Sequence, residues 1–136
     1  MKTITTCHLV RSEDLNHHNT LYAGRAADWL IEAGYMAAEQ FLPSSDVVCA
    51  KIEEMTFYKS IHPGETVCIE SEVVYAPGSR LVSYIGACVG KEQRAEGFIT
   101  FAHVGEDGHS KAHGIVIEPE TEEDKSLQER AKKLLC

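Results

Sequence analysis

Long apolar segments are absent from this sequence of 136 residues. No run approaches the roughly twenty apolar residues that a helix needs to cross a membrane. The first fifteen residues, MKTITTCHLVRSEDL, also lack the apolar core of a secretory signal peptide. We therefore expect no membrane partner and a cytoplasmic location.

Positive charge is scarce as well. The chain has 13 Lys and Arg residues against 21 Asp and Glu residues, a formal net charge of −8. A field of this sign repels a polyanion, so nucleic acid is not an expected partner. A small anionic ligand remains compatible with the charge, because a helix N-terminus or a local pair of cations can hold it.

Paired cysteines are missing from the pattern. The five cysteines are odd in number, lie far apart and include no C-x-x-C motif. This distribution predicts reduced thiols rather than a disulfide framework or a zinc site. The seven histidines give no convincing metal-binding pattern either, so we expect no metal. The cysteines are Cys7, Cys49, Cys68, Cys88 and Cys136.

What the sequence does contain is a regular alternation of structured runs and turns, without repeats or low-complexity tracts. A helix is predicted from Gly24 to about Leu42, where Pro43 ends it. Residues 1–136 are expected to form one domain of the α+β class, an antiparallel sheet wrapped around one long central helix. The predicted strands cover residues 3–10, 47–61, 66–76, 80–90 and 98–104, and the tail at about 120–136 is expected to be a peripheral helix.

Residues 66–75 show the clearest strand alternation. Val67, Ile69, Ser71 and Val73 share one face, which is predicted to be buried. The opposite face, with two glutamates among its side chains, is predicted to be mostly exposed. The residues of that face are Cys68, Glu70, Glu72 and Val74.

Two segments resemble a known family. The run D-L-N-H-H-N-T-L-Y-A-G, Asp14 to Gly24, is followed four residues later by a helical run W-L-I-E-A, Trp29 to Ala33. Further along lies K-I-E-E-M-T-F-Y-K-S-I-H-P-G-E-T-V, Lys51 to Val67. These segments are similar to motifs of the hotdog-fold acyl-CoA thioesterases, especially the short bacterial acyl-CoA hydrolases of YciA type. The resemblance covers nearly the whole chain.

The resemblance implies an enzyme that hydrolyses an acyl-CoA thioester without a cofactor. It also implies a homodimer, or a tetramer or hexamer built from dimers, with each site shared between two subunits. In such sites the N-terminus of the central helix directs backbone N–H groups at the thioester carbonyl. A carboxylate on that helix attacks the carbonyl or activates water.

Two positions match the catalytic part of the motif, whereas Ala23 replaces the first of the family's paired glycines. Asn16 matches the family's loop asparagine, whose amide can bind the attacking water or the thioester oxygen; alternatively, it closes an Asx turn. Gly24, with Ala23 beside it, would supply N–H groups at the helix start, where negative charge develops during hydrolysis.

The position of the family's catalytic acid is occupied by Ile31, which can neither accept a proton nor attack. Glu32 is the first substitute as general base or nucleophile, and Asp28, one turn earlier, is the second. The loop histidines His17 and His18 are further alternatives, since a neutral imidazole can activate water.

The remaining candidates concern substrate binding. Thr20 and Thr56 match hydroxyl positions near the family's site, and Phe57 matches an aromatic residue that lines the acyl or pantetheine channel. Cations near turns are candidates for the phosphates of CoA. They are Lys59, Arg80 and Lys91.

Two other functions stay open. The first is an acyl-CoA-binding or regulatory protein that has kept the pocket and lost the acid at Ile31. The second is a hotdog dehydratase or hydratase, which relies on a histidine or aspartate pair at other loop positions. A serine hydrolase is not supported, because no serine lies in a G-x-S-x-G context.

Overall fold

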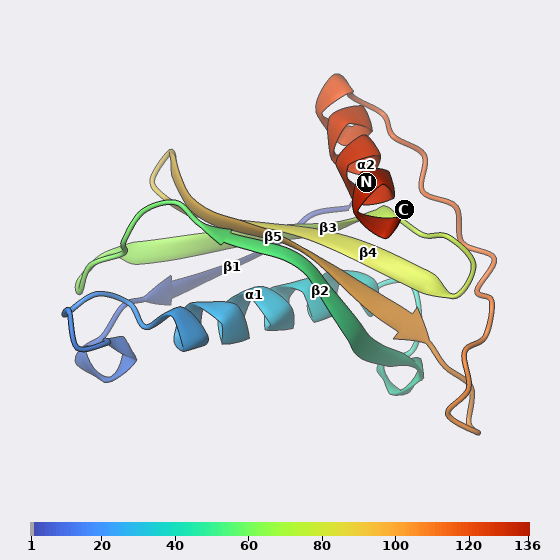
Figure 1. Cartoon of the computed structure of the whole chain (residues 1–136), viewed down its shortest axis with the longest axis horizontal. Coiled ribbons are helices and arrows are strands. Elements are labelled where there is room, and N and C mark those ends of the chain that lie inside the picture. Colours follow the sequence, from blue (N-terminus) through green and yellow to red (C-terminus); the bar gives the residue numbers. More distant parts are fainter. Residues whose placement is uncertain (1) are drawn as a thin grey trace.

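One antiparallel sheet of five strands curves over a long helix in the computed structural model, which describes residues 2–136 (Figure 1). The strands are β1 (Ile4–Leu9), β2 (Val47–Phe57), β3 (Thr66–Tyr75), β4 (Arg80–Val89) and β5 (Glu92–His103). Their order in the sheet is β1-β3-β4-β5-β2, so the first two strands of the sequence form opposite edges. The helices α1 (Ala23–Ala38) and α2 (Glu122–Leu135) lie on opposite faces of the sheet. Short 3-10 helices cover Ser12–Asp14 and Ser44–Asp46.

Helix α1 ends earlier than its sequence predicts. Its last residue is Ala38, and the Glu39 N–H closes the final turn on the Tyr35 carbonyl. The helix approaches the sheet closely because the helix residues that face the sheet are small. A Cβ added to Gly34 of the helix would lie 3.1 Å from a terminal carbon of Ile85 in the sheet. Neither helix among residues 2–136 is long and apolar enough to cross a membrane.

Two buried serines of the sheet fix the position of α1. The Ser71 hydroxyl donates a hydrogen bond to the Ala33 carbonyl at 2.7 Å, and the Ser83 hydroxyl donates to the Gly34 carbonyl at 2.9 Å. These bonds satisfy polar groups that burial would otherwise leave without a partner. They also fix the helix along its own axis, and therefore the position of its first turn.

The alternation of β3 is confirmed on its inner face. Val67, Ile69, Ser71 and Val73 are each 1 % exposed and point toward α1. The outer face differs from the expectation at Val74, which is fully buried because α2 packs there. A second apolar cluster forms between the sheet and this helix; it consists of Val74, Val82, Phe98, Leu127 and Ala131.

The fifth strand is longer than predicted. The sequence predicts a connection between two strands at residues 91–97, but β5 already begins at Glu92. The connection is so short because Gly90 adopts a positive φ of 61°, which suits a tight turn. The polar residues of this segment do not predict a strand. Buried charges such as Arg94 and Glu96 are stable in a strand only when they are paired, and the sequence does not show these partners.

The prediction of free thiols is wrong for two of the five cysteines. Cys7 on β1 and Cys68 on β3 form a disulfide, with their Cα atoms 4.1 Å apart. The pairing of β1 with β3 places them directly opposite each other, although they are 61 positions apart in the sequence. Cysteine spacing along the chain carries no information about such a cross-strand pair.

Candidate functional site

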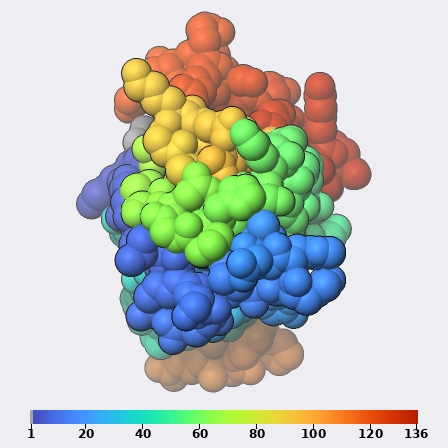
Figure 2. All heavy atoms as spheres, turned by 90° about the vertical axis from the view of Figure 1, so that its left-hand side faces the viewer, coloured from blue at the N-terminus to red at the C-terminus, as the bar shows by residue number. Residues whose placement is uncertain are grey.

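A cavity of about 270 Å³ opens at the end of the sheet where α1 begins. Figure 2 views this end of the molecule, where the N-terminal loop lies against the segment that follows β2. Five residues predicted from the sequence line the cavity: Asn16, Thr20, Ala23, Phe57 and Lys59. Seven further lining residues were not predicted: Leu21, Ala26, Tyr58, Ser60, Ile61, Arg94 and Ala95.

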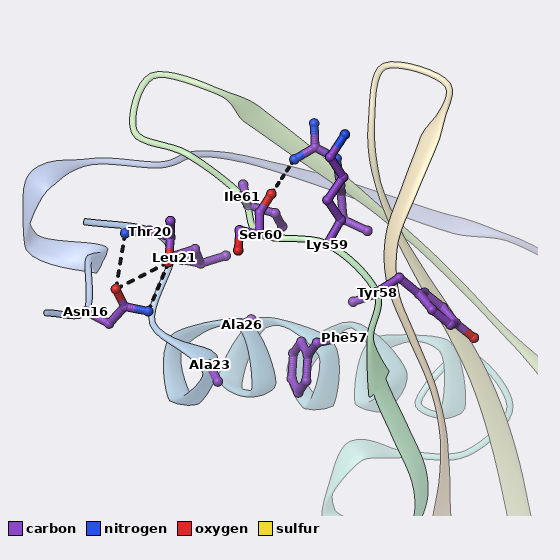
Figure 3. Close-up of a pocket in the computed structure, with 12 residues that line it drawn as sticks. Asn16, Thr20, Leu21, Ala23, Ala26, Phe57, Tyr58, Lys59, Ser60 and Ile61 are labelled. Carbon is purple, nitrogen blue, oxygen red and sulfur yellow. Dashed lines mark hydrogen bonds between the residues drawn. The ribbon is translucent and has the colours of Figure 1, made fainter. Parts of the chain in front are cut away.

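The side chain of Asn16 organises the loop on one side of the cavity (Figure 3). Its Oδ1 accepts hydrogen bonds from the backbone N–H groups of His18 at 2.9 Å and Thr20 at 3.1 Å. Its Nδ2 donates to the Thr20 hydroxyl at 3.0 Å. The amide oxygen is therefore occupied by the loop, as in the Asx-turn alternative, whereas the amide nitrogen keeps a second N–H group for another acceptor.

Buried contacts hold this loop at both ends. The Asp14 carboxylate, 3 % exposed, forms a salt bridge with Arg25 on the first turn of α1 at 3.2 Å, and it accepts the Arg11 N–H at 3.0 Å. At the other end, the Leu21 N–H donates to the Ile61 carbonyl at 2.8 Å. The loop, the helix start and the segment after β2 are thus joined around the cavity.

The first turn of α1 carries free hydrogen-bond donors. The N–H groups of Arg25 and Ala26 both bond to the Tyr22 carbonyl at 3.0 Å. Within residues 2–136, those of Ala23 and Gly24 have no acceptor, and no side chain caps the helix. These donors lie at the positive end of the helix dipole, where an oxygen that gains negative charge is stabilised.

Gly24 itself does not line the cavity, and the Tyr22 side chain packs beside it. A Cβ on Gly24 would lie only 2.5 Å from the Tyr22 ring. Glycine therefore leaves room for an aromatic ring, itself 57 % exposed, beside the first turn of the helix.

The cations of the cavity are already paired with carboxylates. Arg94 is 7 % exposed; it donates to both oxygens of Glu65, at 3.0 and 3.2 Å, and to the Ser60 carbonyl at 2.7 Å. The bonds from Arg94 lower the pKa of Glu65 below its ordinary value. Lys59 lies 3.1 Å from Glu92, and this contact, together with Arg94, lowers the pKa of Glu92.

Three predicted binding residues lie outside the cavity. Thr56 belongs to β2, where it pairs with Glu96, and does not line the cavity. Arg80 begins β4, seven residues before Ala87, which lies at the cavity end of the strand; at about 3.3 Å per residue this is roughly 20 Å away. Lys91 lies in the exposed β4–β5 turn.

The substitute acids also lie elsewhere on the subunit. Glu32 and Asp28 are exposed and line a separate shallow hollow with Ile31. Cys49 on β2 forms another part of its wall. None of the cavity residues described above carries a carboxylate, and residues 2–136 contain no cluster of side chains able to hold a metal ion. His17 and His18 are exposed, and their rings are tilted by 42° with ring centres 3.9 Å apart.

Comparison with known proteins places this geometry in a family. The sequence profile described as "Thioesterase superfamily" matches residues 18–95. An uncharacterized acyl-CoA thioester hydrolase of Bacillus subtilis, YkhA, is 27 % identical over 124 residues, which cover 87 % of this chain and 71 % of that protein.

Solved structures share the fold. An acyl-CoA hydrolase of Staphylococcus aureus, determined with butyryl-CoA, CoA and CoA disulfide, has a TM-score of 0.88 at 21 % identity, covering 98 % of this chain and 81 % of that one. An apo-hexameric acyl-CoA thioesterase has a TM-score of 0.86 at 25 % identity, covering 98 % and 88 %. The expected α+β hotdog fold is therefore confirmed. The match over residues 18–95, more than half of the chain, establishes that this protein belongs to the thioesterase superfamily.

Proposed function

We propose that the protein hydrolyses an acyl-CoA thioester to a free acid and CoA at the cavity beside α1. The observation that carries this proposal is the pair of free N–H groups on Ala23 and Gly24 at the start of the helix. A tetrahedral intermediate develops negative charge on the former carbonyl oxygen. Preorganised donors at that position typically contribute about 3 kcal/mol each to lowering the barrier.

Asn16 supports the same oxygen or the attacking water. Because its Oδ1 is held by two backbone N–H groups, the side chain can act here only as a donor. The free N–H of Nδ2 would bind the thioester oxygen, or a lone pair of the water so that the other lone pair faces the carbonyl carbon. The Thr20 hydroxyl, bonded to Asn16, keeps the amide oriented.

The general base is proposed to be Glu32, with Asp28 as second choice. In the Staphylococcus aureus hydrolase, alanine variants have been solved at an asparagine and at an aspartate fifteen residues apart. Fifteen residues after Asn16 in this chain is Ile31, which has no acid function. Hydrolysis then needs another carboxylate as base, and Glu32 is the next residue on the helix.

Glu32 is proposed to reach the site across a subunit interface. Strand β2 is an edge of the sheet, and three of its apolar side chains, Val48, Ile52 and Phe57, are between 45 % and 48 % exposed. We propose a homodimer joined along this edge, from which a tetramer or hexamer can be built, as in the hexameric relatives. The hollow containing Glu32 and Cys49 borders the same edge and would become part of the interface.

The substrate contacts follow from the lining of the cavity. Phe57, Leu21 and Ala26 offer apolar surface to the acyl or pantetheine chain. Lys59 is proposed to bind a CoA phosphate, exchanging its exposed contact with Glu92 for a more highly charged partner. Neither role requires a cofactor.

Thiol release from a panel of acyl-CoA substrates of increasing chain length tests the proposal. The sharpest variant is Asn16→Asp, which keeps an oxygen for the loop N–H groups and removes the amide donor. We expect kcat to fall by about 10²-fold or more, with an unchanged fold by circular dichroism. Glu32→Gln and Asp28→Asn should separate the two candidate bases. Full turnover in Glu32→Gln would show that the chosen base is wrong.

A second candidate function is acyl-CoA binding without turnover. It is favoured by Ile31 at the acid position and by a cavity without carboxylates in the described subunit. Isothermal titration with a non-hydrolysable acyl-CoA analogue, alongside the thiol-release assay, distinguishes the two functions. Tight binding without thiol release above background would support the binding protein and rule out the hydrolase.

A further inference from the structure

Three cysteines form a row across neighbouring strands. Cys68 on β3 lies directly opposite Cys7 on β1 and also directly opposite Cys88 on β4. Directly opposed residues of antiparallel strands project from the same face of a sheet. All three sulfur atoms therefore belong to the outer face, away from α1, with Cys68 in the middle. We call Cys7, Cys68 and Cys88 the cysteine row.

Strand pairing places Cys68 within disulfide reach of both of its neighbours. It is bonded to Cys7. Opposed residues in antiparallel strands have Cα atoms about 4.5 or 5.5 Å apart, and both spacings fall in the usual disulfide range of about 4.4–6.8 Å. Cys88 can thus bond to Cys68 without a change in strand pairing. Cys7 and Cys88 are two strands apart, roughly 9.5 Å, and cannot bond to each other in the folded sheet.

The surroundings favour an internal reaction partner for Cys68. Cys68 and Cys88 line the same hollow of about 280 Å³, between the sheet and the start of α2. Its wall carries the carboxylates of Glu70, Glu72 and Glu123, and within the described residues no Lys or Arg lines it. This negative charge disfavours the approach of anionic thiols such as glutathione, whereas Cys88 is held beside the disulfide.

We propose that the cysteine row is a site of intramolecular thiol–disulfide exchange. The Cys88 thiolate attacks the Sγ of Cys68, and a new Cys68–Cys88 bond forms. The Cys7–Cys68 bond breaks, and its electron pair leaves on the Sγ of Cys7, which takes up a proton in place of the one that Cys88 released. One disulfide and one thiol are present before and after, so the step needs no oxidant. An external disulfide such as oxidised glutathione is needed only to form the first bond, and it is reduced to two thiols.

The exchange changes which strands are covalently linked. Before it, the disulfide joins the edge strand β1 to β3; after it, the link joins the inner strands β3 and β4. Strand β1 is then held in the sheet by non-covalent contacts alone. Because β1 leads directly into the loop that carries Asn16, the exchange alters the anchoring of one wall of the cavity.

The rate of exchange depends on how much Cys88 is ionised. Burial, and then the Glu70 carboxylate, raise the pKa of the Cys88 thiol. The groups facing it across the hollow are Glu70 and Glu72 of β3, Tyr84 of β4 and Glu123 of α2, and none of them stabilises a thiolate. Below this pKa, the thiolate fraction and the rate should rise about tenfold for each pH unit.

The first experiment removes Cys7, the cysteine on the edge strand β1. Cys7→Ser is incubated with oxidised and reduced glutathione, quenched in acid, alkylated, digested without reduction and mapped by mass spectrometry. We expect the Cys68–Cys88 peptide pair as the main disulfide product. Only free thiols, glutathione adducts or links to Cys49 or Cys136 would overturn the proposal. Cys136→Ser is the matched control and should keep the wild-type pattern.

A second measurement on the wild-type chain decides the matter if Cys7→Ser does not fold. Protein carrying the Cys7–Cys68 bond is held at about pH 7 and about pH 8 without added thiol, then quenched and mapped in the same way. The Cys68–Cys88 pair should appear, with an initial rate about tenfold higher at the higher pH and independent of protein concentration. Its absence at all times contradicts the proposal. Cys88→Ser should show no exchange.

Discussion

Arg130 on α2 donates two hydrogen bonds to the carboxylate of Glu96 on β5, at 3.0 and 3.3 Å. Glu96 is 6 % exposed and also accepts hydrogen bonds from the hydroxyls of Tyr84, at 2.9 Å, and Tyr58. One buried charge therefore connects the C-terminal helix to a residue that lines the cavity. The outer face of the sheet is thus held by a polar network as well as by the apolar cluster.

We expect Arg130→Met to destabilise the protein by about 2 kcal/mol, because it leaves the Glu96 charge buried with hydroxyl partners only. The value lies below the usual cost of breaking a buried pair since the Arg130 side chain is 40 % exposed. Urea unfolding measures the change. Lys133→Met, on an exposed position of the same helix, should stay within about 0.5 kcal/mol of wild type. Equal effects of the two variants would contradict a specific role for Arg130.

Stability should fall on acidification, and Glu96 should contribute to the fall. Burial alone raises the pKa of Glu96, but the hydrogen bonds from Arg130, Tyr58 and Tyr84 outweigh it, and the pKa lies below its ordinary value of 4.5. A lowered folded-state pKa gives stability that is fully present above the unfolded value and is lost as pH falls through the folded value. Urea unfolding between about pH 7 and pH 3 should show this loss. Glu96→Gln should have a flatter profile, and a parallel profile would exclude Glu96 as a source.

The two serine bonds to α1 should each contribute to stability. Ser71→Ala and Ser83→Ala each remove a buried hydrogen bond to a helix carbonyl, so each should cost about 1 kcal/mol of unfolding free energy. Because Ser71 and Ser83 lie on neighbouring strands and hold adjacent residues of α1, the double variant tests coupling between them. Ser79→Ala, outside the helix contact, serves as control. A neutral result for both single variants would mean that packing alone positions the helix.

Gly24→Ala should affect activity more than stability. The new Cβ would meet the Tyr22 ring at 2.5 Å, and this ring is free to move because it is largely exposed. The unfolding free energy should change by less than about 1 kcal/mol, while the displaced ring should reduce kcat/KM roughly tenfold, equivalent to 1.4 kcal/mol. If the clash is the cause, adding Gly24→Ala to Tyr22→Ala should have no further effect.

The Cys7–Cys68 bond should stabilise the fold by about 2–4 kcal/mol, since it closes a long loop of the unfolded chain. Comparing thermal unfolding of the oxidised and reduced protein measures this contribution. Cys68→Ser should behave like the reduced wild type under both conditions. A bond that leaves the transition unchanged would show that β1 is already held fully by its other contacts.

The fold was largely predictable from local patterns, and the cavity from motif positions. The period of the apolar residues predicts the buried face of β3, and the run of small helix-forming residues predicts α1. Five of the candidate site residues, including Asn16 and Phe57, line one cavity. Arg94 escaped prediction because it is a buried cation in a polar segment. Its burial depends on the ion pair with Glu65, and no local sequence pattern predicts that these two residues are in contact.

Arg80 lies away from the cavity for a different reason. A cation beside a turn is a candidate phosphate ligand, but a strand has two ends, and only the topology decides which of them faces the cavity. The cross-strand disulfide escaped for the same reason. Both depend on which strands are neighbours in the sheet.

The order β1-β3-β4-β5-β2 also has a consequence for synthesis on the ribosome. The two strands made first have no partner when they emerge: β1 must wait for β3, and β2 must wait for β5, which ends at His103. The hairpins of β3, β4 and β5 can form locally, whereas both edges close only through distant contacts, which form slowly. The apolar residues of β2 are therefore exposed in the nascent chain until most of the polypeptide has been made. During this interval β2 offers an apolar segment to which a chaperone can bind.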